Sequence, residues 1–433
     1  DIASKQIYIE HIPESYESGR HINASRFVMI TAGFEWEFKR NYPNGIKKRI
    51  QTIKAEQTVT DIIDSLIKGH TGKAKEIFKY LAKLISTDNL ESRIITYGRD
   101  YNNISTIFGN HLYKLNNEEL KYNEPWILQR ADPYVYRHTD GNYYFTASIP
   151  AYDRIVLRRS ETLAGLKDAE EVTVWEKHKE GIMSEHIWAP ELHYLDGKWY
   201  IYFAGGDKDD VWAIRPYVLE CADTDPLTGV WTEKGKMGRA DADEFSFEAF
   251  SLDATVFENK GKHYYVWAEK VGVGKQISNL YIGEMETPYK LKTVQVLLTS
   301  PDYDWERVGF WVNEGPAVIH HDGRIYLTYS ASETGTAYCM GMLTADENSD
   351  LLDPKSWTKE RYPVLRTDES RGIYGPGHNS FTEDEEGNPI MVYHARTEAE
   401  IEGNPLYNPN RHAMLMKIRW DEKTGAPIFS YED

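Results

Sequence analysis

The chain has 433 residues, of which 41% are hydrophobic and 13% aromatic, and it carries a net charge of −18. This hydrophobic content is enough for a folded core and excludes a disordered chain, and no apolar run approaches the roughly 20 residues that cross a bilayer. The acidic balance argues against nucleic acid as a partner, because phosphates would be repelled. No signal-peptide pattern is visible, so a cytoplasmic and a secreted location both stay open.

Residues 1–122 differ from the rest in charge and in pattern. They hold 18 Lys and Arg against 15 Asp and Glu, a net charge of +3, whereas the remainder carries −21. The segment 27–38 is rich in apolar residues without a break, and helical spacing recurs in 59–67 and 77–85. The sequence therefore predicts a small α-helical accessory module of unknown role over 1–122.

From residue 123 the pattern changes to the period of two that strands show. Tyr200 and Tyr202 alternate in this way, and Asp-Gly pairs at Asp140, Asp196 and Asp322 mark tight turns between antiparallel strands. Cys221 and Cys339 lie in strand-like contexts, and two cysteines in so long a chain do not form a disulfide framework. We expect both to be buried free thiols.

Five segments of this region share one plan, in which a polar residue opens a strand and a Gly-containing turn leads into an aromatic strand. The opening residues are spaced by 59, 62, 61 and 64 positions, and they are Asp132, Glu191, Asp253, Glu314 and His378. Self-similarity at a nearly fixed period is typical of repeat architectures. The sequence predicts a mainly β fold, with 123–433 as a five-bladed β-propeller.

In a propeller the first strand of each blade lines the central channel, so the five opening residues would converge on one pocket. Paired carboxylates are the groups that glycosidic cleavage needs, one protonated and one ionised. A third acid nearby raises the pKa of one partner through like charge. The sequence alone does not rank the four acids.

Five short motifs add a resemblance to this pattern. They are Ala131-Asp132-Pro133, the block 188–193, Ser251-Leu252-Asp253-Ala254, Asn313-Glu314-Gly315-Pro316 and the block 375–380. Together they resemble glycoside hydrolase family 43 over 123–433. The resemblance implies a five-bladed propeller and hydrolysis with inversion, with Asp132 as general base, Glu314 as general acid, and Asp253 orienting the acid and raising its pKa.

The resemblance also implies roles for residues around these acids. His378 would bind an ion, often calcium, mostly through waters, or else hydrogen-bond to water or to an acid. Trp188 resembles a family position near the sugar pocket, and Glu191 and Phe250 lie close to the inferred site. Arg396 ends a strand of the fifth repeat, from which it would reach the base or a sugar hydroxyl. We expect these four residues to contact the substrate. No cofactor is required.

The motifs read most like those of an exo-acting α-L-arabinofuranosidase that releases L-arabinofuranose from arabinan or arabinoxylan, polysaccharides of the plant cell wall. A β-xylosidase and an endo-arabinanase with the same mechanism remain open, as does a carbohydrate-binding propeller without catalysis. The sequence predicts neither a nucleic-acid nor a membrane partner, and it does not give the oligomeric state.

Overall fold

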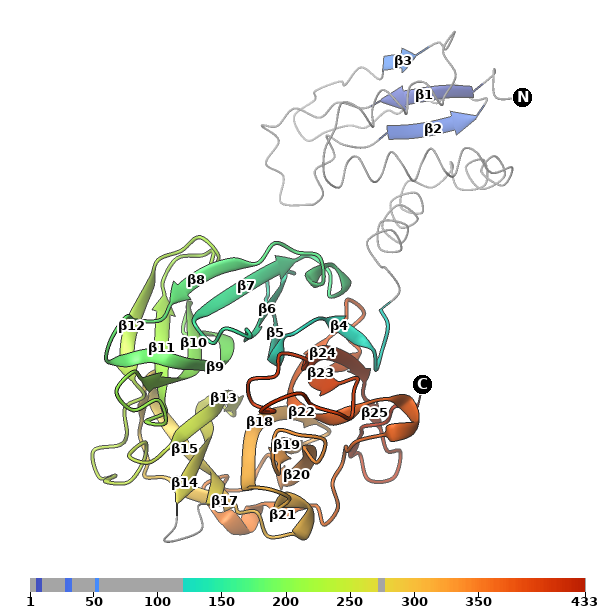
Figure 1. The fold of residues 1–433 in the computed structure, drawn as a ribbon. Coiled ribbons are helices and arrows are strands. Elements are labelled where there is room, and N and C mark those ends of the chain that lie inside the picture. The colour runs from blue at the N-terminus through green and yellow to red at the C-terminus, as the bar shows by residue number, and fades with distance from the viewer. Residues whose placement is uncertain (1–4, 10–27, 33–50, 54–119, 272–276, 433) are drawn as a thin grey trace. The chain divides into compact units, whose positions relative to one another are not determined.

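The computed structural model (Figure 1) describes residues 5–9, 28–32, 51–53, 120–271 and 277–432. The chain divides into two compact units, residues 1–119 and residues 120–433. Among the described residues, no helix has the length and hydropathy required of a membrane span.

The described part of the first unit consists of three strands, β1 (Lys5–Ile9), β2 (Val28–Ala32) and β3 (Gln51–Ile53). They form an antiparallel sheet in the order β2-β1-β3. The predicted helical module is therefore wrong for these segments, and β2 lies within the predicted helical segment 27–38. β-Branched residues favour strands, and a short apolar run fits a buried strand as well as a helix. The helices predicted in 59–67 and 77–85 lie outside the described residues.

The second unit is mainly β, as predicted, and its first two sheets each have four antiparallel strands. The first sheet contains β5 to β8, at Ala131–Arg137, Tyr143–Ser148, Arg154–Ser160 and Val172–Glu176. The second contains β9 to β12, at Ile182–Leu195, Lys198–Asp207, Arg215–Cys221 and Trp231–Lys236.

Parallel pairing of β15 with β18 joins the third and fourth groups of strands into one nine-stranded sheet. The third group contains β13 to β17, at Ser251–Asn259, Lys262–Val271, Ile277–Thr287, Lys290–Leu291 and Val296–Thr299. The fourth contains β18 to β21, at Trp311–His321, Arg324–Ala331, Cys339–Asp346 and Thr358–Lys359.

The fifth sheet combines both ends of the second unit. Its order is β22-β23-β24-β4, and the strands lie at Tyr374–Glu383, Pro389–Arg396, His412–Lys417 and Pro125–Ile127. β25 (Arg419–Trp420) and β26 (Pro427–Ile428) form a separate pair. Short 3₁₀ helices in the connections are η3 to η6, at Ala164–Leu166, Asp304–Glu306, Pro354–Ser356 and Glu369–Arg371.

The sheets are arranged around a common centre, with β5, β9, β13, β18 and β22 innermost (Figure 1). The strand that follows each of these carries large aromatic side chains that are almost fully buried, including Tyr143, Trp199, Tyr265, Tyr326 and Tyr393. These rings fill the space between neighbouring sheets. Cys221 and Cys339 are buried and free, which confirms the prediction for both thiols.

Each innermost strand carries a β-bulge at the same place. Its pairing with the next strand shifts register there, and the residue at the shift has a positive φ in all five strands. These residues are Asp132 (53°), Ala189 (45°), Asp253 (48°), Gly315 (54°) and His378 (44°). A bulge bends the strand and changes the direction of its side chains. The same β-bulge therefore recurs in all five innermost strands around the centre.

Candidate active site

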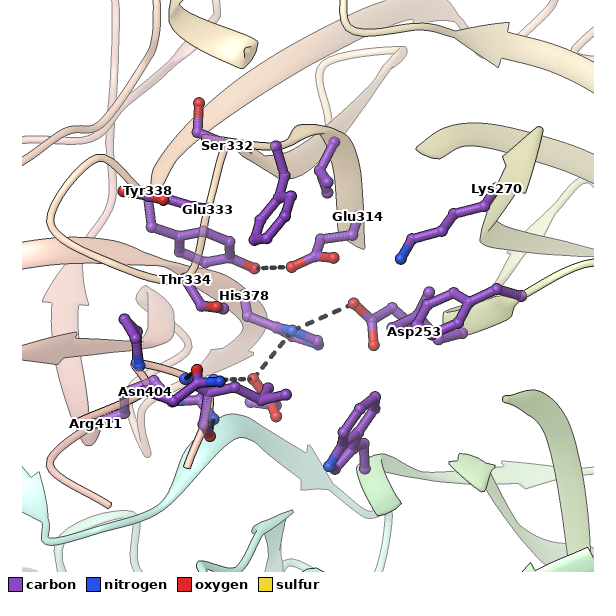
Figure 2. A pocket seen from close by; sticks show the side chains of 18 of the residues that line it. Asp253, Lys270, Glu314, Ser332, Glu333, Thr334, Tyr338, His378, Asn404 and Arg411 are labelled. Atoms are coloured by element: carbon purple, nitrogen blue, oxygen red, sulfur yellow. Dashed lines mark hydrogen bonds and ion pairs between the residues drawn. The ribbon is translucent and has the colours of Figure 1, made fainter. Parts of the chain in front are cut away.

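A cavity of about 790 Å³ opens at the bulges (Figure 2). All five innermost strands contribute to its lining, through Asp132, Trp188, Asp253, Glu314 and His378. The sequence-based expectation that polar residues from five repeats share one pocket therefore holds for Asp132, Asp253, Glu314 and His378.

The bulges explain which residue of each strand reaches the cavity. At the positive-φ position, Asp132, Asp253 and His378 line it, whereas the equivalent residues of β9 and β18 are alanine and glycine. At the preceding position, Trp188 and Glu314 line it. Glu314 thus reaches the cavity with a longer side chain from one position earlier than the two aspartates.

Glu191 lies two positions after the positive-φ residue of its strand, and it does not line the cavity. Its carboxylate is buried and lies 2.8 Å from Nε2 of His193. The spacing of the repeats had aligned Glu191 with Asp132, but the register shift places it at the position of Tyr134 in the first sheet. Sequence spacing does not reveal a bulge, because a bulge is a property of the pairing with the neighbouring strand.

Cationic and hydrogen-bonding groups surround the buried carboxylate of Asp132. Its Oδ1 lies 3.2 Å from Nδ1 of His378 and 3.7 Å from Nη1 of Arg411, and its Oδ2 accepts a 2.6 Å hydrogen bond from Ser148. Burial alone would raise the pKa of Asp132, but the charge of His378, aided by Arg411, outweighs burial and holds the pKa well below its usual range. Asp132 is therefore ionised.

His394 supports the backbone of Asp132. Its Nδ1 accepts a 3.0 Å hydrogen bond from the amide N–H of Asp132. Burial lowers the pKa of His394 to about 4, so the ring is neutral and its Nδ1 is free to accept. This hydrogen bond fixes the strand at the bulge, where the positive φ of Asp132 would otherwise be unfavourable.

Asp253 and Glu314 lie in an electrostatic environment opposite to that of Asp132, because it favours the protonated form of a carboxyl group. Burial raises the pKa of Asp253 to about 8, and the charges of Glu314 and Asp132 add to the rise, although His378 opposes it. Burial likewise raises the pKa of Glu314. Oδ2 of Asp253 accepts a 3.2 Å hydrogen bond from the amide of Gly315, the residue after Glu314. The pair therefore holds a proton near neutral pH, and Asp253 fixes the backbone beside Glu314.

His378 lies between the two aspartates. Its Nδ1 is 3.2 Å from Asp132 and 3.7 Å from Asp253, and Figure 2 shows the ion pair between His378 and Asp253 as a dashed line. Burial would lower its pKa, but Asp132 and then Asp253 and Glu314 raise it above the usual value. Among the described residues, no group of three or more His, Cys, Asp or Glu is arranged to hold a metal directly. The calcium ion that the resemblance implied, bound mostly through waters, stays a prediction.

Aromatic side chains form one wall and part of the rim. Trp188 stacks on His186 with 4.5 Å between ring centroids, and Phe250 lies 3.8 Å below Nζ of Lys270. Both rings line the cavity, as do the more exposed Trp212 and Phe310. Such surfaces suit the apolar face of a sugar ring.

Arg396 does not line this cavity. Its guanidinium is buried and donates to Oδ1 of Asn408 and to the carbonyl of Pro405, both at 2.7 Å. It thus holds the segment 404–408, whereas Arg411 is the arginine that reaches Asp132. The expected contact of an arginine with the carboxylate exists, but a different residue makes it.

The sequence matches the family model described as "Glycosyl hydrolases family 43" over residues 122–425. This match covers more than half of the chain and includes every candidate residue above. The chain belongs to glycosyl hydrolases family 43.

Relatives with curated names support this membership. The chain is 50% identical over 309 residues to an "Extracellular exo-alpha-(1->5)-L-arabinofuranosidase" of Streptomyces avermitilis, covering 71% of this chain and 63% of that protein. It is 50% identical over 285 residues to a protein of the same name from Streptomyces chartreusis, covering 66% of this chain and 85% of that protein. The chain thus spans less than two thirds of the length of the Streptomyces avermitilis relative.

A solved structure is also similar. The crystal structure of an alpha-L-arabinofuranosidase from Lactobacillus brevis aligns with a TM-score of 0.67 and 51% sequence identity. The alignment covers 71% of this chain and 96% of that chain.

Lys270, Tyr338 and Arg411 are among the cavity residues of this family 43 chain that were not found from the sequence. Lys270 is near the end of β14, and Tyr338 and Arg411 each precede a strand, β20 and β24. None of them opens a repeat or stands in a motif that carried the resemblance. Only the fold brings them to the carboxylates.

Proposed function

We propose that the chain is an inverting exo-α-L-arabinofuranosidase whose five groups of sheet strands form a five-bladed propeller. The observation that carries the proposal is the contrast between two carboxyl environments in one cavity: cations hold Asp132 ionised, whereas burial favours the protonated form of Glu314. This division is what an inverting glycosidase requires of its base and its acid.

In the proposed mechanism, Asp132 takes a proton from a water molecule as the water oxygen bonds to the anomeric carbon. Glu314 donates its proton to the glycosidic oxygen as the bond from that oxygen to the anomeric carbon breaks. The product is β-L-arabinofuranose, with inverted configuration. Asp132 stays ionised because His378 and Arg411 contact the same oxygen atom, Oδ1.

Asp253 acts on Glu314 without touching the bond that breaks. Its hydrogen bond with the amide of Gly315 fixes the backbone that carries the acid. Its negative charge, when present, disfavours ionisation of Glu314, because two like charges in a buried site repel. The two proton transfers of the proposed mechanism use carboxyl groups alone, and His378 lies between the two aspartates.

The choice of sugar rests on the relatives. Those at 50% identity carry the name exo-α-(1→5)-L-arabinofuranosidase, and we extend that activity, with arabinan of the plant cell wall as substrate, to this chain. The same names include the word extracellular, and we propose that location as well. A β-xylosidase or an endo-arabinanase would use the same three acids, so the sugar must be tested directly.

The test compares hydrolysis of p-nitrophenyl α-L-arabinofuranoside with that of p-nitrophenyl β-D-xylopyranoside, by the wild type and by Glu314→Ala. We expect preference for the arabinoside, and a mutant slower by about two to four orders of magnitude. Proton NMR of the first product should show the β-anomer. Preference for the xyloside would change the assigned sugar, and retention of configuration would refute the inverting mechanism. If neither glycoside nor arabinan oligosaccharides are cleaved, the proposed activity fails and a sugar-binding propeller without catalysis is the remaining function.

A further inference from the structure

Tyr338 contacts the candidate acid directly. Its phenol donates a 2.9 Å hydrogen bond to Oε1 of Glu314, and Figure 2 shows Tyr338 and Lys270 on either side of that carboxyl group. Burial raises the pKa of Tyr338 well above its usual value, so the phenol keeps its proton and remains a donor. Glu314 is half-buried, and a donor at this distance restricts the orientation of its side chain.

Packing fixes the ring of Tyr338 on two faces. It stacks on His394 with 5.6 Å between centroids and an angle of 8° between the planes. It also lies against Gly377, where an added Cβ would come within 2.5 Å of Cε1 of the tyrosine. Tyr338 is 1% exposed, so its phenol has little freedom to leave Glu314.

Gly377 occupies a special place in the repeat. It precedes the bulge of β22 just as Glu314 precedes the bulge of β18. In β9 the equivalent residue, Trp188, projects into the cavity, but Gly377 has no side chain and leaves its space to the ring of Tyr338. Strand β22 thus makes room for Tyr338, in the connection before β20, to reach the acid.

The stack also connects the two candidate catalytic carboxyl groups. His394, under the ring of Tyr338, accepts the hydrogen bond from the amide of Asp132. One rigid pair of rings therefore supports the acid through the phenol and the base through the imidazole.

We infer that Tyr338 is a positioning residue that holds the carboxyl group of Glu314 in the orientation for proton donation. This inference rests on the proposed function, in which Glu314 is the acid. The phenol acts on the acid in two ways. It fixes the direction of the proton, and as a donor to the carboxylate it stabilises the ionised form.

Tyr338→Phe removes the hydrogen bond and leaves the packing of the ring intact. Losing a donor to the carboxylate raises the pKa of Glu314, and the acid must be protonated to act. The alkaline limb of the pH profile of kcat/KM should therefore move upward, by about one pH unit. At the optimum, kcat should fall roughly tenfold or more on an arabinoside with a poor leaving group, and much less on the 2,4-dinitrophenyl arabinoside, whose leaving group needs little protonation.

The matched control is Tyr200→Phe. Tyr200 is similarly buried and also donates to a carboxylate, Glu220, at 2.8 Å, but outside the cavity. It should leave the pH profile and the dependence on the leaving group unchanged. An unmoved alkaline limb in Tyr338→Phe, with equal losses on both substrates, would overturn the inference and reduce Tyr338 to a packing role.

Carboxyl ¹³C NMR gives a readout that does not require turnover. The resonance of Glu314, assigned by its loss in Glu314→Gln, should titrate at higher pH in Tyr338→Phe than in the wild type. If the wild type cleaves no glycoside, the proposed function fails, and this titration still decides whether Tyr338 controls the carboxyl group. An identical titration in both proteins would overturn the inference.

Discussion

Arg411 should control the pH at which the base is lost. Its Nη1 lies 3.7 Å from Oδ1 of Asp132, and both side chains are at least 90% buried. At this distance and an effective dielectric constant of about 20, the attraction is about 4.5 kcal/mol. That energy corresponds to about three pKa units. It is an upper bound, because His378 remains 3.2 Å from the same oxygen.

Arg411→Met therefore raises the pKa of Asp132. A base must be ionised, so activity is lost as the pH falls through the pKa of Asp132 in the folded protein. The depressed pKa places this loss at low pH in the wild type. In Arg411→Met the acidic limb of kcat/KM should move upward by as much as about three pH units. The assay is hydrolysis of an aryl α-L-arabinofuranoside between about pH 3 and pH 8, within the range where the fold persists by circular dichroism.

Two further variants separate charge from packing. Arg411→Lys keeps a positive charge and should shift the acidic limb less than Arg411→Met. Arg396→Met removes a guanidinium that is as deeply buried but binds the segment 404–408 instead of Asp132. The electrostatic reasoning fails if the acidic limb of Arg411→Met matches the wild type, or if Arg396→Met shifts it equally.

Two other predictions concern Asp253 and Gly315. Asp253→Asn removes a charge that disfavours ionisation of Glu314, so the alkaline limb of kcat/KM should move to lower pH; an upward shift would contradict the like-charge argument. Gly315→Ala forces alanine to a φ of 54° and places its Cβ 3.1 Å from Cγ of His378, so urea unfolding should show a loss of about 1–2 kcal/mol or more. Gly141→Ala, at a φ of 85° with no atom within 4 Å, measures the backbone contribution alone, and an equal loss there would exclude a role for the contact with His378.

The sequence predicted the innermost strands because each of them opens a segment with the same order: a polar residue, an apolar strand, a turn and an aromatic strand. The turns also followed local chemistry: Asp196-Gly197 and Asp322-Gly323 have positive φ at both positions, as a two-residue hairpin requires. The strand order and the turns depend on residues that are adjacent in the sequence, so they can be predicted without knowing how the strands pair.

The predictions were wrong where the pairing between strands determines which side chain reaches the cavity. A repeat aligned by spacing treats Glu191, Asp253 and Glu314 as equivalent, whereas the bulges place them at three different positions relative to the register shift. Arg396 and Arg411 both lie in the fifth repeat, and only the path of the loop between them determines which one reaches Asp132. Strand β2 was taken for part of a helix because a short apolar run fits both periods.

The pairing of β4 with β24 has a consequence for how the protein is made. His378, His394 and Arg411 lie 3.2, 3.4 and 3.7 Å from Oδ1 of Asp132, and all three come long after Asp132 in the sequence. A ribosome must therefore synthesise the chain as far as Arg411 before Asp132 acquires all three of these partners. β4 then joins the sheet that supplies these partners. A product that terminates before Arg411 would contain the first four groups of strands and still lack a partner of the base, so turnover would report synthesis past Arg411.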